Sequence, residues 1–162
     1  MKDQKEKGHS IKTDFRGLLE RDGKFVYKNK GTSMYPLIRE GRDLLVIEKI
    51  REKPKKYDVL LYQRDQGEYV LHRVLEVRPD GYVLNGDNCW WKEYGITDRH
   101  IIGILTAVIR DGKELSTGSW QYRLYTRLWC GFFPVRAALL KGKTLPVRIR
   151  RKLLSGRNRP SG

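Results

Sequence analysis

Ser33 and His72 are the residues whose types and spacing could do chemistry. Ser33 lies between Gly31 and Pro36 in the segment Gly-Thr-Ser-Met-Tyr-Pro, and His72 follows thirty-nine residues later. A serine hydroxyl is nearly inert at neutral pH unless a neighbouring base takes its proton, and histidine has the ordinary pKa suited to that task. The glycine and the proline can present the hydroxyl at the edge of a cleft beside free backbone N–H groups. If the two side chains meet in space, they could act as nucleophile and general base of a hydrolase.

Each residue alone also has a simpler interpretation. Ser33 could lie in a surface turn, and His72 could bond a backbone carbonyl at a sheet rim. Asp87, in Asn-Gly-Asp-Asn at 85–88, either belongs to a polar turn or orients His72 through a ring N–H hydrogen bond. Asp98 is a rival for that role, and its alternative interpretation is the cap of a helix or turn. These alternatives stay open on the residues alone.

The elements that must position these residues are mostly strands. Residues 68–78 alternate most clearly, with Leu71 and Arg73 on one face and His72 on the other, and turns at 64–67 and 78–81 flank them. A short helix capped by Ser10 and ended by Gly23 precedes the strands. The pattern predicts a mainly β fold, a coiled antiparallel sheet or partly open barrel, with strands at 24–29, 43–49, 57–63, 68–78, 82–85 and 101–110.

Length and charge divide the chain into three parts. The 162 residues are a one-domain length, and 39% apolar residues suffice for a small core. The net charge is +15, and no Asp or Glu follows Glu114. Eleven cations lie in that acid-free stretch: Arg123, Arg127, Arg136, Lys141, Lys143, Arg148, Arg150, Arg151, Lys152, Arg157 and Arg159. We predict a disordered N-terminus at 1–9, a β domain at 10–112 and a basic aromatic tail at 113–162.

Five motifs together resemble one family. They are Gly-x-Ser-Met-x-Pro at 31–36, Tyr-Asp-Val at 57–59, Leu-His-Arg-Val at 71–74, Gly-Asp-Asn at 86–88 and Ile-Gly at 102–103. Their types and order resemble the signal peptidase and LexA-like serine peptidase superfamily, over roughly half of the chain. With His72 where most bacterial members carry a lysine base, the chain is similar to the histidine-bearing branch of SipW-type and endoplasmic-reticulum signal peptidases.

The resemblance implies a peptidase fold and an acyl-enzyme mechanism. Ser33 would attack the scissile carbonyl of a peptide or protein substrate like a signal or leader peptide, and His72 would take its proton. Asp87 would assist His72, with Asp98 as rival, and the Ser33 N–H would be one oxyanion donor. Gly31 stands where some relatives carry a hydroxyl, so a second donor is not identified. The alternatives are a non-catalytic peptide-binding module of the same fold and a nucleic-acid-binding protein that acts through its tail.

The tail favours an anionic partner. Aromatic and aliphatic residues alternate with cations over 119–154, as in helices that lie in an anionic bilayer interface. Nucleic acid fits the charge but usually binds less aliphatic surface, and a third interpretation packs the tail on the domain. No transmembrane span, secretory signal, metal pattern or cofactor motif is visible. We therefore expect free cysteines, no cofactor and a cytoplasmic protein or one peripheral at the inner membrane face.

Overall fold

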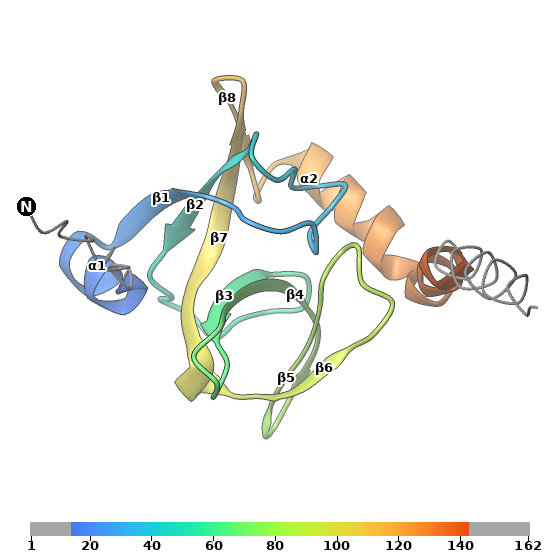
Figure 1. The fold of residues 1–162 in the computed structure, drawn as a ribbon, viewed down its shortest axis with the longest axis horizontal. Helices are drawn as coiled ribbons and strands as arrows, with labels where there is room; N and C mark the ends of the chain where they lie inside the picture. The colour runs from blue at the N-terminus through green and yellow to red at the C-terminus, as the bar shows by residue number, and fades with distance from the viewer. Residues whose placement is uncertain (1–13, 143–162) are drawn as a thin grey trace, which may run out of the picture.

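The fold is an eight-stranded antiparallel sheet that does not close, in a computed structural model that describes residues 14–142. The strand order is β1-β2-β7-β3-β4-β5-β6, and β8 pairs with β7 off this path (Figure 1). The strands are β1 (Lys24–Lys28), β2 (Leu44–Glu48), β3 (Val59–Gln63), β4 (Tyr69–Arg78), β5 (Gly81–Asn85), β6 (Glu93–Ile96), β7 (Ile101–Arg110) and β8 (Lys113–Ser116). The predicted mainly β, antiparallel class is confirmed.

A short helix precedes the sheet, as predicted. Helix α1 (Phe15–Asp22) begins after Asp14, whose carboxylate accepts from the Gly17 N–H, and it ends at Gly23. Gly23 adopts φ 72°, a left-handed conformation that glycine enters without steric cost. The predicted Ser10 cap and the predicted disorder of residues 1–9 lie outside the described residues.

Two apolar clusters hold the sheet and flank the region of His72. Leu61 and Leu71 belong to the larger cluster, which also includes Met34, Ile38, Leu45, Ile47 and Leu105. Leu60 and Tyr62 belong to the second, with Val74, Tyr82, Leu84, Ile96 and Ile101. Successive residues of β3 enter different clusters because side chains alternate across a strand. In the β3–β4 register Leu60 lies opposite His72, which puts the histidine on the face of the second cluster.

The chain continues beyond the predicted boundary at residue 112 without leaving the sheet. Strand β8 pairs with β7, with Ala107 opposite Ser116. Helix α2 (Trp120–Tyr125) follows, then the π-helical segment η2 (Thr126–Cys130), and helical conformation resumes over residues 133–142. These helices run along one side of the sheet (Figure 1). The part of the predicted tail at 143–162 lies outside the described residues.

The helices of the described part are too short or too polar for a bilayer span. Within residues 14–142, no helix is both long and apolar enough to cross a membrane.

Candidate active site

Ser33 and His72 line the same cleft. Its volume is about 900 Å³, and its walls come from the segment at 27–33, from β3 and β4, and from the loop after β5. Apolar side chains of Phe15, Tyr27, Leu61, Tyr69 and Leu71 line it together with polar residues. The structure therefore brings together two residues that are thirty-nine positions apart in sequence.

The loop that carries Ser33 is fixed on both sides of the serine. Met34 is buried in the larger apolar cluster, and its carbonyl accepts from Ile38 N–H at 2.9 Å. The Asn88 backbone N–H donates to the Ser33 carbonyl at 2.7 Å, and Asn88 Nδ2 donates to the Thr32 carbonyl at 3.2 Å. The loop of the Gly-Asp-Asn motif is thus bonded directly to the loop of the serine motif.

Gly86 allows the close approach of these two loops to the histidine. A Cβ at this position would lie 2.6 Å from the Ser33 carbonyl oxygen and 3.1 Å from His72 Nε2. Only a residue without a side chain fits between them as they stand. His72 Nε2 and the Ser33 peptide therefore both face Gly86.

The other ring nitrogen of His72, Nδ1, lies close to a tyrosine and a glutamate. His72 Nδ1 lies 3.1 Å from Tyr62 Oη and 3.3 Å from Glu93 Oε2. Tyr62 Oη donates to Glu93 Oε2 at 2.7 Å, so its oxygen is left to accept from Nδ1–H. Both neighbours of Nδ1 therefore act as acceptors toward the ring. This arrangement holds the proton on Nδ1 and leaves the Nε2 lone pair toward Gly86 and the cleft.

Charged neighbours keep Glu93 ionised. Arg64 donates to both carboxylate oxygens of Glu93, at 2.6 and 2.7 Å. Burial alone would raise the pKa of Glu93, but the hydrogen bonds from Arg64, His72 and Tyr62 outweigh burial and hold this pKa well below its usual range. Burial and the bond to Glu93 raise the pKa of Tyr62 well above its usual value, so the phenol keeps its proton. Glu93 is therefore a carboxylate that can stabilise a protonated imidazole.

The hydrogen bond that would transfer a proton from Ser33 is not formed. Among the described residues, neither Ser33 Oγ nor His72 Nε2 has a hydrogen-bond partner, and the Ser33 N–H also has none. Free enzymes often have long catalytic hydrogen bonds that shorten when substrate binds. The unpaired Ser33 N–H is free to donate to a substrate oxygen.

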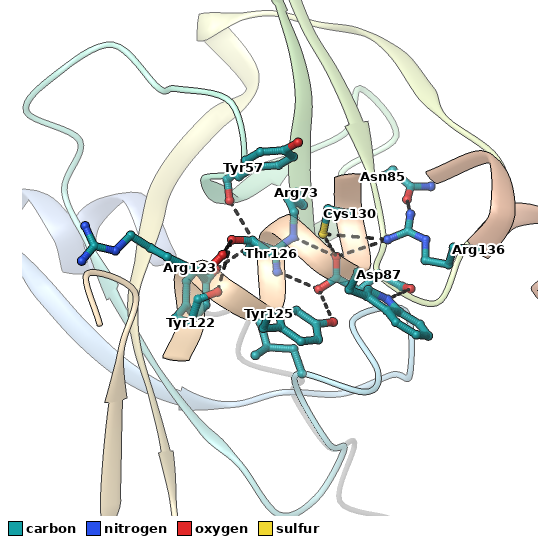
Figure 2. A network of polar contacts seen from close by, with 12 residues as sticks. Tyr57, Arg73, Asn85, Asp87, Tyr122, Arg123, Tyr125, Thr126, Cys130 and Arg136 are labelled. Carbon is teal, nitrogen blue, oxygen red and sulfur yellow. Dashed lines mark hydrogen bonds and ion pairs between the residues drawn. The ribbon is translucent and has the colours of Figure 1, made fainter. Parts of the chain in front are cut away.

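Asp87 lies elsewhere, in a buried network under the C-terminal helices (Figure 2). Its carboxylate accepts two hydrogen bonds from the Arg73 guanidinium, at 2.8 and 2.7 Å, and one from Tyr125 Oη at 3.0 Å. Arg136 approaches the same carboxylate at 3.9 Å. Arg73 and Asp87 are 0% and 1% exposed. The structure does not bring the Asp87 carboxylate to the ring of His72; within residues 14–142, Tyr62 and Glu93 are the partners of that ring.

Asp98 is also distant from the cleft of Ser33. It begins the short helix η1 (Asp98–His100) and accepts from Tyr82 Oη at 2.6 Å. It lines a separate cleft between α1 and the segment at 49–54. The structure therefore brings Ser33 and His72 together and places both predicted aspartates in other surroundings.

Glu93 is not among the site residues that the sequence predicts. The predicted strands end at residue 85 and resume at 101, so β6 is missing and with it the position of Glu93 opposite Leu84.

One signal for the surroundings of Asp87 was present in the sequence. Arg73 alternates with apolar residues in the clearest strand, and a buried arginine needs a carboxylate partner, which Asp87 supplies.

The site contains no grouping typical of metal ligands. Within the described part of the chain, no cluster of three His, Cys, Asp or Glu residues has the geometry to hold a metal ion. Cys89 and Cys130 are both free and buried.

Comparison of the chain with protein-family models, with curated proteins and with solved structures gave no significant match.

Proposed function

We propose that this chain is a serine endopeptidase of the signal-peptidase-like class, with the LexA–signal peptidase type of fold, that cleaves a peptide or protein substrate. The observation that carries the proposal is the common cleft of Ser33 and His72, in which Nδ1 is bonded and Nε2 has no partner among residues 14–142. The motif resemblance assigns the same two residues to the nucleophile and the base.

The chemistry follows from the hydrogen bonds around the histidine. His72 Nε2 takes the proton of the Ser33 hydroxyl while Ser33 Oγ bonds to the substrate carbonyl carbon. The positive charge that develops on the ring is stabilised by Glu93, which lies 3.3 Å from Nδ1. We assign to Glu93 the supporting role that the sequence alone suggested for Asp87 or Asp98.

The remaining steps return the enzyme to its starting state. The Ser33 N–H donates to the oxyanion of the tetrahedral intermediate. His72 then gives its proton to the leaving amine, and the C–N bond breaks to leave an acyl-serine. Water attacks this ester with Nε2 again as base, and the acid product leaves with Ser33 restored.

A test that needs no known substrate is digestion of a peptide library prepared from a whole proteome. New peptide termini are identified by mass spectrometry for the unmodified chain and for Ser33→Ala and His72→Ala. We expect both substitutions to reduce the rate of product formation by about 10⁴-fold or more. Ser116→Ala, a serine on β8 outside the cleft, is the matched control and keeps full activity. Cleavage retained by either purified cleft variant would overturn the assignment.

A second candidate function is a peptide-binding module that does not cleave. The absence of a hydrogen bond between Ser33 Oγ and His72 Nε2 in the described structure favours it. This candidate predicts peptides that remain intact on the protein and bind equally well to Ser33→Ala.

A further inference from the structure

The C-terminal helices have two distinct faces, and only one of them contacts the domain. Between residues 120 and 142, positions at helical spacing turn toward the sheet. Tyr122, Thr126, Cys130 and Arg136 are buried there, and Trp129 Nε1 donates to the Asp87 carbonyl at 2.9 Å. The helices are therefore held to the domain through the buried network of Arg73 and Asp87.

The opposite face carries an exposed row of large apolar side chains. The six residues recur every three or four positions and are between 48% and 65% exposed: Trp120, Leu124, Leu128, Phe132, Val135 and Leu139. At about 1.5 Å per residue the row is roughly 30 Å long. The other large exposed apolar residues of the described chain are spread over strands and loops. A contiguous row of this kind usually marks an interaction surface.

Charge identifies the class of partner. Arg123 and Arg127 are exposed beside the row, and the chain has no acidic residue after Glu114. A second copy of this face would place its arginines against Arg123 and Arg127, and like charges repel. The chain's own residues 143–162 carry seven cations and would repel these two arginines in the same way. Nucleic acid would match the charge but leave six large apolar side chains against water. A surface that is both anionic and apolar fits all of these features.

We propose that the row from Trp120 to Leu139 docks on an anionic lipid bilayer, with its apolar side chains among the acyl chains and Arg123 and Arg127 at the phosphate groups. This inference is independent of the proposed peptidase activity. It also has a consequence for the cleft. The buried face of the same helices bonds the loop at 85–91, where Arg136 contacts Asn85 and Trp129 contacts Asp87, so docking would place that loop and the cleft near the membrane surface.

The test is sedimentation of the full chain with lipid vesicles. One set contains phosphatidylcholine alone, and the other contains phosphatidylcholine and phosphatidylglycerol in equal amounts. We expect binding to the anionic set that weakens as salt increases. Leu124→Glu with Leu128→Glu should lower the partition coefficient about a hundredfold, because each buried leucine contributes about tenfold.

Two further variants separate the contributions of the row and its charges. Val26→Glu with Val77→Glu makes the same change of charge at exposed valines of β1 and β4 and should bind like the unmodified chain. Arg123→Gln with Arg127→Gln should lower binding to anionic vesicles about twenty-five-fold, since each cation contributes about fivefold. This variant leaves the buried face intact, so it tests the proposal even if the glutamate pair fails to fold.

Several outcomes would overturn the proposal. They are no binding to either set of vesicles, equal binding by the leucine and valine variants, and binding to RNA or duplex DNA without binding to vesicles. Concentration-dependent dimers that the leucine variant abolishes, without vesicle binding, would identify a second copy as the occupant instead. Because the proposal does not involve Ser33, labelling of Ser33 in solution should be the same in the leucine variant and the unmodified chain.

Discussion

His72 and Arg73 are neighbours on β4, and each faces a carboxylate in a different environment. On one face, His72 contacts Glu93 at the wall of an open cleft, where one ring nitrogen has no partner among the described residues. On the other, the Arg73 guanidinium is enclosed by Asp87, Tyr122 and the Tyr57 carbonyl. The first arrangement leaves an atom free to react, and the second leaves none free on Arg73 or Asp87. The His72–Glu93 pair thus suits proton transfer, and the Arg73–Asp87 pair suits attachment of a helix to the domain.

The Gly86-Asp87-Asn88 motif serves both regions at once. Gly86 and Asn88 contact the Ser33 loop and His72, while Asp87 between them turns toward Arg73 and the C-terminal helices. The motif therefore connects the cleft to the helices whose outer face we assign to the membrane.

The largest expected effect on stability belongs to the buried pair. Asp87→Asn leaves the Arg73 guanidinium buried without its carboxylate, which typically costs about 3–5 kcal/mol of the free energy of unfolding. Urea denaturation followed by tryptophan fluorescence measures this difference. Glu76→Gln, which breaks the exposed pair with Arg78, is the control and should leave the free energy of unfolding nearly unchanged. If Asp87→Asn lost activity while keeping full stability, Asp87 would belong to the cleft and the contrast would fail.

Glu93→Gln should show the opposite pattern. The amide cannot stabilise a protonated His72 as the carboxylate does, so we expect kcat/KM to fall about a hundredfold with the fold retained. Glu68→Gln is the matched control, because Glu68 also bonds Arg64 at the cleft but has no contact with His72. The kcat/KM of both variants, measured with one cleaved peptide, decides whether contact with His72 or contact with Arg64 carries the effect. Equal losses would mean that Arg64, not contact with the ring, carries the effect.

Gly86→Ala tests the junction of the two regions. The new methyl group would lie 2.6 Å from the Ser33 carbonyl oxygen and 2.8 Å from Cys89 Sγ, so the loops must separate. We expect a loss of about 1–3 kcal/mol from overpacking and a lower kcat, because the serine moves relative to His72. Gly118→Ala, where the nearest atom would be 3.6 Å away, should change neither quantity. Full activity of the Gly86 variant would show that the close approach is not needed for function.

The smallest expected effect is on stability at acid pH. The folded-state pKa of Glu93 is lower than that of an unfolded carboxyl, ordinarily about 4.3, so its contribution to stability is present above that pH and is lost as the pH falls below it. The free energy of unfolding, measured by thermal unfolding from neutral to acid pH, should therefore fall more steeply with decreasing pH for the unmodified chain than for Glu93→Gln. The difference should be on the order of 1 kcal/mol. Parallel curves would contradict the ionised state assigned to Glu93.

Most strands of the sheet were predictable from the sequence, but β6, β8 and the position of Glu93 were not. Strand β4 was predictable because Tyr69, Leu71 and Arg73 alternate with Val70 and His72 over an uninterrupted run. Strand β6 was not, because Trp90 and Trp91 precede it and Gly95 adopts φ 77° within it. Without β6, Asp87 was the nearest acid in the motif. The side of the loop that the Asp87 carboxylate faces depends on the anionic partner that Arg73 requires. No local sequence pattern encodes this long-range contact.

The C-terminal part gives a similar lesson. Aromatic and aliphatic residues among cations over 119–154 predicted a helix at an anionic interface or one packed on the domain, but not which face points away from the domain. The buried contacts of Tyr122 with Arg73, and of Cys130 and Arg136 with Asp87, decide the orientation. Tertiary contacts therefore set the direction of an amphipathic pattern that the sequence leaves open.

The central claim is that His72 activates the Ser33 hydroxyl. The most direct measurement is reaction of the purified full chain with a fluorophosphonate, followed by peptide mass spectrometry to locate the adduct and its rate of formation. We expect an adduct on Ser33 in the unmodified chain and in Ser116→Ala, none at this position in Ser33→Ala, and much slower formation in His72→Ala. An unmodified Ser33, or labelling at the same rate without His72, would contradict activation of the serine by the histidine.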